Sequence, residues 1–246
     1  MEFQTKEIME IILNNLEVIG QGSQGICYHN QKTNEVYKIF HQALDNNDDY
    51  FINYTKDELL RFSNIKNKTF LWAKDTIKIK DEIVGYITNY VKSNSLYKIN
   101  PLKINLNTFS NRIMLAKKDI KIISERGVKT YDLMYNLLYG NKFYVTDFDE
   151  FSYSDKDSKA LEETNNRNFD YEIYCFLIDN YLDEFISQYK ILNKMYQEKD
   201  EDILLFIELL KKYLSEYVGR EVKTLNDACK CLNKEKKKES LYQRYL

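Results

Sequence analysis

A glycine-rich stretch between two strand-like segments places the strongest constraint on how this chain folds. Residues 18–40 read VIGQGSQGICYHNQKTNEVYKIF, and Gly20, Gly22 and Gly25 form a G-x-G-x-x-G pattern in a chain of 246 residues that has only seven glycines. β-branched and aromatic residues alternate with other residues on both sides of the loop, which is typical of strands. The pattern predicts a twisted antiparallel run over residues 16–40, with the glycines at a turn.

Three kinds of loop use glycines to bring the backbone close to phosphate. In a dinucleotide-binding unit the loop opens a helix, whereas here Gly25 is followed by the strand-like residues Ile26, Cys27 and Tyr28. A Walker loop ends in Gly-Lys-Ser or Gly-Lys-Thr, which this loop lacks. The remaining kind is a lid made of two strands and the loop between them, which covers nucleotide phosphates. The residues favour this third kind.

The composition of the whole chain argues against several other classes of function. The chain is 43% hydrophobic and 30% charged with a net charge of -2, which is ordinary for a globular protein and gives no sign of a nucleic-acid or membrane partner. No apolar stretch is long enough for a membrane span, and the N-terminal residues are acidic, so we expect a cytoplasmic protein. The four cysteines and two histidines show neither a disulfide framework nor zinc-ligand spacing.

Hydrophobic periodicity predicts a chain with strands in its first part and helices in its second. Apolar residues recur every three or four positions in the predicted helices and alternate in the predicted strands. Residues 152–168 are polar and show no period, so no element is predicted there. In chain order we expect a helix over 5–15, strands within 16–40, a helix over 54–65, two strands within 76–91, a helix over 107–126, short strands within 128–151, and two or three helices after residue 168.

A lid over phosphates requires a cation and carboxylates farther along the chain. Lys38 supplies the cation, because the segment 36–39 reads VYKI and has the character of the V-A-I-K motif. Glu58, in the predicted helix that follows, is in the place of the carboxylate that holds such a lysine. These two residues make the phosphate-lid interpretation specific enough to check against the rest of the chain.

At the next motifs the chain resembles the protein-kinase-like superfamily. Asp132 and Leu133 look like the Asp-Leu pair of the kinase catalytic loop, and residues 147–149, Asp-Phe-Asp, look like a D-F-G motif whose glycine is replaced. They follow the glycine loop and Lys38 in the order and approximate spacing of that superfamily, which includes bacterial and small-molecule kinases. The resemblance covers residues 16–151.

This resemblance implies a bilobal α+β fold. Residues 1–91 would form an N-lobe with an antiparallel sheet and one helix, and residues 92–246 a mainly helical C-lobe. It implies an ATP- and Mg²⁺-dependent phosphotransferase that passes the γ-phosphoryl group to a Ser, Thr or Tyr hydroxyl of a protein substrate. The implied sites are catalytic Asp132 and Lys38; nucleotide-binding Gly20, Gly22, Gly25, Lys38 and Glu58; and metal-binding Asp147, Asn136 and Asp149.

The chain also departs from the kinase pattern. The family's metal-binding asparagine lies five residues after the catalytic aspartate, whereas Asn136 lies four after Asp132. Asp149 would compensate as a second carboxylate near the metal. Thr130 and Tyr131 stand where the family has His and Arg, and no A-P-E sequence follows, so we expect no switch through a phosphorylated activation loop.

Two alternatives stay open at this point. A pseudokinase, which binds nucleotide or a regulatory partner without catalysis, fits the altered motifs. A small-molecule kinase of the aminoglycoside or choline type is the other, and the cluster Asp155, Asp157, Glu162 and Glu163 is the candidate for its acidic acceptor pocket. Asp170 is the candidate for the buried aspartate on the central helix of the C-lobe.

Overall fold

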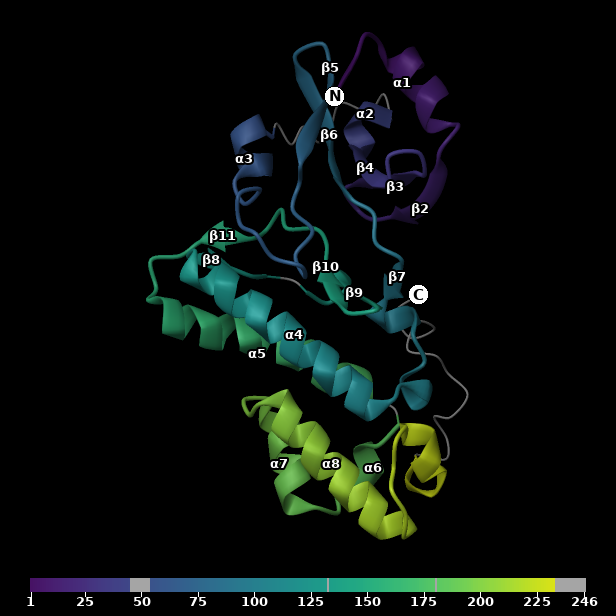
Figure 1. The fold of residues 1–246 in the computed structure, drawn as a ribbon, viewed down its shortest axis with the longest axis vertical. Coiled ribbons are helices and arrows are strands. Elements are labelled where there is room, and N and C mark those ends of the chain that lie inside the picture. The colour runs from purple at the N-terminus through teal and green to yellow at the C-terminus, as the bar shows by residue number, and fades with distance from the viewer. Residues whose placement is uncertain (45–53, 132, 180, 233–246) are drawn as a thin grey trace. The chain divides into compact units, whose positions relative to one another are not determined.

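The computed structural model describes residues 1–44, 54–131, 133–179 and 181–232, and the chain divides into two compact units. The first unit comprises residues 1–66 and 71–92, and the second comprises residues 67–70 and the chain from residue 93 onward. Asp132 lies outside the described residues. Figure 1 shows the elements of both units, coloured from the N-terminus to the C-terminus.

The first unit is built on a six-stranded sheet with the order β1-β5-β6-β4-β3-β2. Every neighbouring pair is antiparallel except β1 and β5, which run parallel. The antiparallel run predicted over residues 16–40 and the strand pair predicted within 76–91 are confirmed. The strands are β1 (Glu2–Phe3), β2 (Glu17–Gln21), β3 (Gly25–Asn30), β4 (Glu35–Phe40), β5 (Asp75–Ile79) and β6 (Glu82–Asn89).

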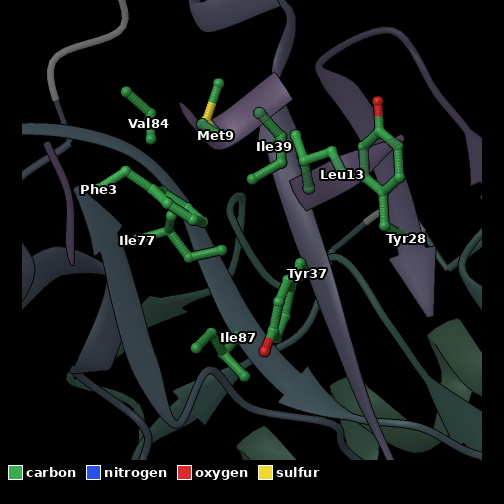
Figure 2. Close-up of a cluster of buried hydrophobic side chains, with 9 residues drawn as sticks. All are labelled: Phe3, Met9, Leu13, Tyr28, Tyr37, Ile39, Ile77, Val84 and Ile87. Carbon is green, nitrogen blue, oxygen red and sulfur yellow. The ribbon is translucent and has the colours of Figure 1, made fainter. Parts of the chain in front are cut away.

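Helix α1 (Lys6–Leu13) packs on one face of this sheet. The Thr5 side chain accepts a hydrogen bond from the Ile8 backbone and so caps the helix N-terminus. Met9 and Leu13, four positions apart, share the buried face of the helix and join the core of the unit. Figure 2 shows this cluster, which comprises Phe3, Met9, Leu13, Tyr28, Tyr37, Ile39, Ile77, Val84 and Ile87.

The other helices of the first unit are short. Helix α2 (His41–Leu44) follows β4 directly, and α3 (Lys56–Leu60) is shorter than the helix predicted over 54–65. The chain turns after α3, where the buried ring of Phe62 packs on Trp72 with 5.2 Å between the ring centroids. Tertiary packing therefore overrides the helical period in this segment.

The second unit is mainly helical. Helices α4 (Leu106–Glu125) and α5 (Ser158–Ile178) lie side by side, as Figure 1 shows, and α8 (Ile203–Val218) packs against both. A cluster of aromatic rings fills its core, with Phe109 5.3 Å from Phe143 and 5.8 Å from Phe176 between ring centroids. The remaining helices are η1 (Leu96–Lys98), η2 (Pro101–Lys103), α6 (Asp183–Ile186), α7 (Lys190–Glu198) and η3 (Leu225–Cys231).

Two small sheets accompany these helices. One has the order β10-β9-β7, and the other pairs β11 with β8; all of these pairs are antiparallel. The strands are β7 (Ser93–Ser95), β8 (Val128–Lys129), β9 (Leu137–Gly140), β10 (Phe143–Val145) and β11 (Ser152–Tyr153).

The observed bounds of the two long helices, α4 and α5, differ from the predicted ones. Helix α4 ends at Glu125, and Gly127, just beyond the C-cap residue Arg126, has a φ of 76°, a backbone conformation that favours glycine. Helix α5 begins at Ser158, eleven residues before the predicted start at residue 169, because Asp157 caps it by accepting hydrogen bonds from two backbone N–H groups. The prediction that 152–168 holds no element is therefore wrong.

The fold class predicted from the sequence is confirmed. The first part of the chain is an antiparallel sheet with helices on it, and the second part is helical with short strand pairs. Within the described residues, no helix combines the length and the apolar character needed to cross a membrane.

Candidate functional site

The glycine loop joins β2 to β3 as a tight turn. The backbone N–H of Gly22 donates a hydrogen bond of 3.0 Å to the Gly25 carbonyl. A Cβ atom on Gly25 would lie 2.2 Å from the Ile39 carbonyl oxygen, so only glycine allows β4 to approach this closely. A Cβ on Gly20 or Gly22 would meet no atom of the described residues within 4 Å. The first two glycines therefore present an open backbone, and the third serves the packing of the sheet.

The tip of the loop is tied to the end of β4 and the start of α2. The His41 backbone N–H donates to the Gln24 carbonyl at 3.0 Å, and His41 Nε2 lies 2.9 Å from the Gly22 carbonyl oxygen. The Gln24 side chain points toward β4, where its Oε1 accepts a hydrogen bond of 3.0 Å from Lys38 Nζ. These three contacts hold the loop against β4.

Lys38 lies in the middle of the sheet. It is opposite Cys27 on β3 and Tyr86 on β6, and its Nζ is 5.4 Å from the centre of the Tyr86 ring. The residue is only 6% exposed, and a buried ammonium group needs polar or aromatic partners to offset the loss of water. The structure thus brings Lys38 together with the glycine loop, as the lid interpretation requires.

Glu58 does not take the position that the sequence suggested. It lies exposed at the start of α3, where its Oε2 accepts hydrogen bonds of 2.7 Å from both the backbone N–H and the hydroxyl of Thr55. The Glu58 backbone N–H donates in turn to the Thr55 hydroxyl, completing a capping box. The hydrogen bond from the Thr55 backbone N–H is the main cause of the lowered pKa of Glu58. In the described part of the chain, Glu58 is therefore a helix cap and not the partner of Lys38.

In the second unit, the β9–β10 hairpin brings two of the expected metal ligands together. The strands pair Leu137 with Val145, and beyond this pair the Thr146 backbone N–H donates to the Asn136 carbonyl at 2.9 Å. The Thr146 hydroxyl donates to the same carbonyl at 3.2 Å. Asn136 and Asp147 therefore lie at the same end of one hairpin, although Asn136 is one position early in the sequence motif.

Asp147 has an unusual backbone conformation. Its φ of 54° lies in the left-handed region, which costs a non-glycine residue on the order of 1 kcal/mol. Packing on both sides holds the residue there: Phe148 is buried, and the Val145 backbone N–H donates to the Thr69 carbonyl at 2.8 Å. Strain of this kind persists where a fixed side-chain direction is needed, as in a metal ligand.

The donor set at this end of the hairpin fits magnesium. Asp147, Asn136 and the partly buried Asp149 offer two carboxylates and one amide, and Mg²⁺ takes oxygen ligands while keeping several waters. In residues 1–44, 54–131, 133–179 and 181–232, no three or more His, Cys, Asp or Glu side chains form a group that could hold a metal ion. An Mg²⁺ ion here would therefore depend on the amide of Asn136 and on phosphate oxygens or water.

The backbone that leads to Asp132 is anchored by two asparagines of α5. Asn165, which is 0% exposed, accepts a hydrogen bond of 2.9 Å from the Thr130 backbone N–H and donates one of 2.8 Å to the Val128 carbonyl. Asn168 donates to the Thr130 carbonyl at 2.9 Å. The sequence interpretation missed both asparagines. The signal for Asn165 was its place in the stripe formed with Leu161 and Phe169, four residues away on either side.

Asp170 is buried, as the sequence suggested, but it connects helices instead of holding the segment before Asp132. Its Oδ2 accepts hydrogen bonds from Lys117 Nζ on α4 at 2.7 Å and from the Ile203 backbone N–H of α8 at 3.3 Å. Lys117 also donates to Asp202, the cap of α8, at 2.8 Å. Burial raises the pKa of Asp170 to about 6, and the charge of Lys117 opposes this increase.

The acidic cluster that a small-molecule kinase would need is largely a surface feature. Asp155 and Glu163 are exposed, and Glu162 is half-buried. Asp157, also exposed, caps α5 through hydrogen bonds from the backbone N–H groups of Lys159 and Ala160.

Comparisons with known proteins give only remote likenesses. No protein-family model matches the chain, and no curated protein matches its sequence. Among solved structures it is similar to the kinase domain of PknI from Mycobacterium tuberculosis, with 11% identity, a TM-score of 0.48, and 80% of this chain and 94% of that chain covered. It is also similar to the CAK complex from Chaetomium thermophilum bound to ATP-γ-S, with 13% identity, a TM-score of 0.44, and 56% and 46% covered. The fold itself is α+β, with a six-stranded sheet in the first unit and a mainly helical second unit.

Proposed function

We propose that this chain is a phosphotransferase that uses ATP and Mg²⁺ and transfers the γ-phosphoryl group to a hydroxyl group of a protein. One observation supports the proposal: the Thr146 backbone N–H, next to Asp147, donates to the Asn136 carbonyl, and Asp147 has a left-handed backbone. Lys38, buried and in contact with the tip of the glycine loop, supports the same conclusion from the first unit.

Each residue has a distinct part in this proposal. The open backbone of Gly20 and Gly22 would lie against the phosphates, and Lys38 would balance the charge that moves with the γ-phosphoryl group. Asp132 would accept or orient the proton of the acceptor hydroxyl. Asp147, Asn136 and Asp149 would hold Mg²⁺, which when bound neutralises phosphate oxygens.

A pseudokinase is the second candidate, and one observation favours it. Glu58 is used as a helix cap, so it is not the carboxylate that the kinase resemblance assigns to Lys38. A nucleotide-binding module without catalysis has no need of that pair. A protein substrate and a cytoplasmic location belong to the proposal of an active kinase, whereas a regulatory partner belongs to this second one.

The first experiment is a calorimetric titration of the whole chain with ATP, in Mg²⁺ and then in excess chelator. We expect binding that requires Mg²⁺ and that Asp147→Ala weakens at least tenfold, because the variant loses a charged metal ligand. Asp155→Ala, which removes an exposed aspartate outside the site, is the matched control and is expected to bind as the unmodified chain does.

Phosphoryl transfer to a peptide library then separates the candidates. Transfer that requires both Lys38 and Asp132 identifies an active kinase. Binding that is indifferent to Mg²⁺ and to Asp147→Ala, without transfer, identifies a pseudokinase. Transfer to amino alcohols but not to peptides would overturn the proposed substrate class, and no binding of ATP at all would overturn the proposed function.

A further inference from the structure

We infer that Gln24 is an internal ligand of Lys38, which an incoming phosphate group displaces when nucleotide binds. The side chain of Gln24 would thus keep the glycine loop fastened over Lys38 in the protein without nucleotide. This inference rests on the proposed function for the identity of the displacing group. The hydrogen bond between Gln24 and Lys38 is independent of the proposed function.

The position of Gln24 in the loop carries the inference. Gln24 lies between Gly22 and Gly25, at the tip of the turn, and its half-buried side chain reaches the middle of β4. Its Oε1 accepts a hydrogen bond of 3.0 Å from Lys38 Nζ. Lys38 is therefore hydrogen-bonded to the glycine loop, and the resemblance assigns both of them to phosphate binding.

The chemistry of the two groups makes the bond replaceable. An ammonium group has three N–H donors, and an uncharged amide oxygen occupies one of them. A phosphate oxygen carries negative charge, and a hydrogen bond between two charged groups is about twice as strong as one with a neutral acceptor. Phosphate therefore competes successfully for Lys38, but the energy of the broken amide bond is subtracted from its affinity.

The displacement needs only the side chain of Gln24 to move. The backbone of the loop is held separately, because the His41 N–H donates to the Gln24 carbonyl and His41 Nε2 contacts the Gly22 carbonyl. These contacts do not involve Gln24 Oε1. A change of the Gln24 side chain should therefore alter access to Lys38 while the turn itself stays folded.

Two substitutions at one position test the inference in opposite directions. Gln24→Leu keeps the approximate size of the side chain and removes the acceptor, so Lys38 should react faster with an amine-acylating reagent, by about threefold or more. Gln24→Glu places a full negative charge beside Lys38 and should slow that reaction by a similar factor. The extent of labelling at Lys38 is measured by mass spectrometry of peptides. Gln21→Leu is the matched control, since Gln21 is an exposed glutamine at the end of β2.

Titration with Mg²⁺ and ATP supplies the second measurement. Gln24→Leu should lower the dissociation constant by about threefold to tenfold relative to Gln21→Leu, because the competing hydrogen bond is absent. ATP should also protect Lys38 of the unmodified chain from acylation. Thermal unfolding of each variant verifies that the chain is folded.

The outcomes separate the inference from the proposed function. Equal labelling of Lys38 in Gln24→Leu, Gln24→Glu and Gln21→Leu would overturn the inference, whatever the protein binds. Labelling that changes as expected, in a protein that does not bind ATP, would leave Gln24 as the ligand of Lys38 but overturn the proposed function and, with it, displacement by nucleotide. Unchanged ATP affinity in a variant with altered labelling would overturn the competition between Gln24 and phosphate.

Discussion

At the scale of single residues, the backbone conformation of Asp147 lowers the stability of the fold and restricts the direction of its side chain. The left-handed backbone that fixes its carboxylate is a conformation that glycine adopts without strain. Thr146 on one side and Phe148 on the other hold it in place through the hairpin bond to Asn136 and through burial. The residue is therefore expected to trade stability for function.

Asp147→Gly should make the fold more stable and the site less effective. Relief of the left-handed strain is expected to raise the free energy of unfolding by about 0.5–1 kcal/mol. Loss of the carboxylate should abolish the Mg²⁺ dependence of ATP binding. Urea unfolding and calorimetry measure the two effects, and Asp147→Asn, which tolerates the same backbone conformation, is the control. A less stable glycine variant would contradict the assignment of strain.

Asp170 should make stability depend on pH in a defined window. Its pKa in the folded chain, about 6, is above the ordinary value of 3.8, so the native state holds a proton that the unfolded chain has released. The contribution of Asp170 to stability is therefore fully present below about pH 4 and is lost as the pH rises through 6. The loss is about 3 kcal/mol.

Asp170→Asn tests this dependence. The variant cannot titrate, so its free energy of unfolding should fall less than that of the unmodified chain between about pH 4 and pH 7. Denaturant unfolding at several pH values provides the measurement. Asp155→Asn, at an exposed position, is the control and should keep the original slope. If the pH dependence of the free energy of unfolding is unchanged in Asp170→Asn, another group is responsible for it.

At the scale of elements, α5 supports the segment before Asp132. Asn165→Ala would leave the Thr130 N–H and the Val128 carbonyl without their hydrogen bonds to the helix, which costs about 2–3 kcal/mol of stability. If Asp132 is catalytic, the variant should lower kcat more than it raises the KM for ATP, because nucleotide contacts are assigned to other residues.

The control for this prediction lies on the same helix. Glu163→Ala changes an exposed residue of α5 and should leave both kcat and stability close to their original values. Kinetics at several ATP concentrations, together with urea unfolding, provide the comparison. A loss of stability in Asn165→Ala without a change in kcat would make Asn165 a purely structural residue.

The elements also show what a sequence pattern can and cannot predict. The strands around the glycine loop were predicted because alternation and turn residues act locally, within a few positions. The start of α5 was not predicted, because the first half of this helix is polar. Its buried Asn165 forms its hydrogen bonds with the backbone of a segment that is distant in sequence. Glu58 was assigned to Lys38, but Thr55, three residues away, bonds it first. Glu58 thus forms a local capping interaction instead of the predicted long-range ion pair.

At the scale of the whole molecule, both units hold part of the predicted site. The glycine loop and Lys38 belong to the first unit, whereas Asn136, Asp147 and Asp149 belong to the second. The sequence predicted the α+β fold correctly, and the roles of these motif residues stay predictions. It left the acceptor substrate undefined, because no acceptor pocket follows from the spacing of charged residues along the chain.

Mg²⁺ and ATP together should stabilise the native chain as a whole. A ligand that binds only the native state raises the free energy of unfolding by about 2.7 kcal/mol when its free concentration is a hundred times its dissociation constant. We expect a higher unfolding temperature with both ligands than with ATP in excess chelator. Asp147→Ala should remove the difference between these two conditions, and a difference that persists would place the metal elsewhere.

The contrast between the three loop glycines has a consequence for evolution. A side chain at position 25 would collide with the backbone at Ile39, so Gly25 is required by the sheet whether or not the protein binds a nucleotide. Among the described residues, nothing lies within 4 Å of a Cβ built on Gly20 or Gly22, so the packing of that part of the chain does not require glycine at these two positions. In a lineage that abandoned phosphate, the first two glycines would drift while the third persisted. The variability of positions 20 and 22 among descendants, and not that of position 25, would record whether the ancestral ligand was kept.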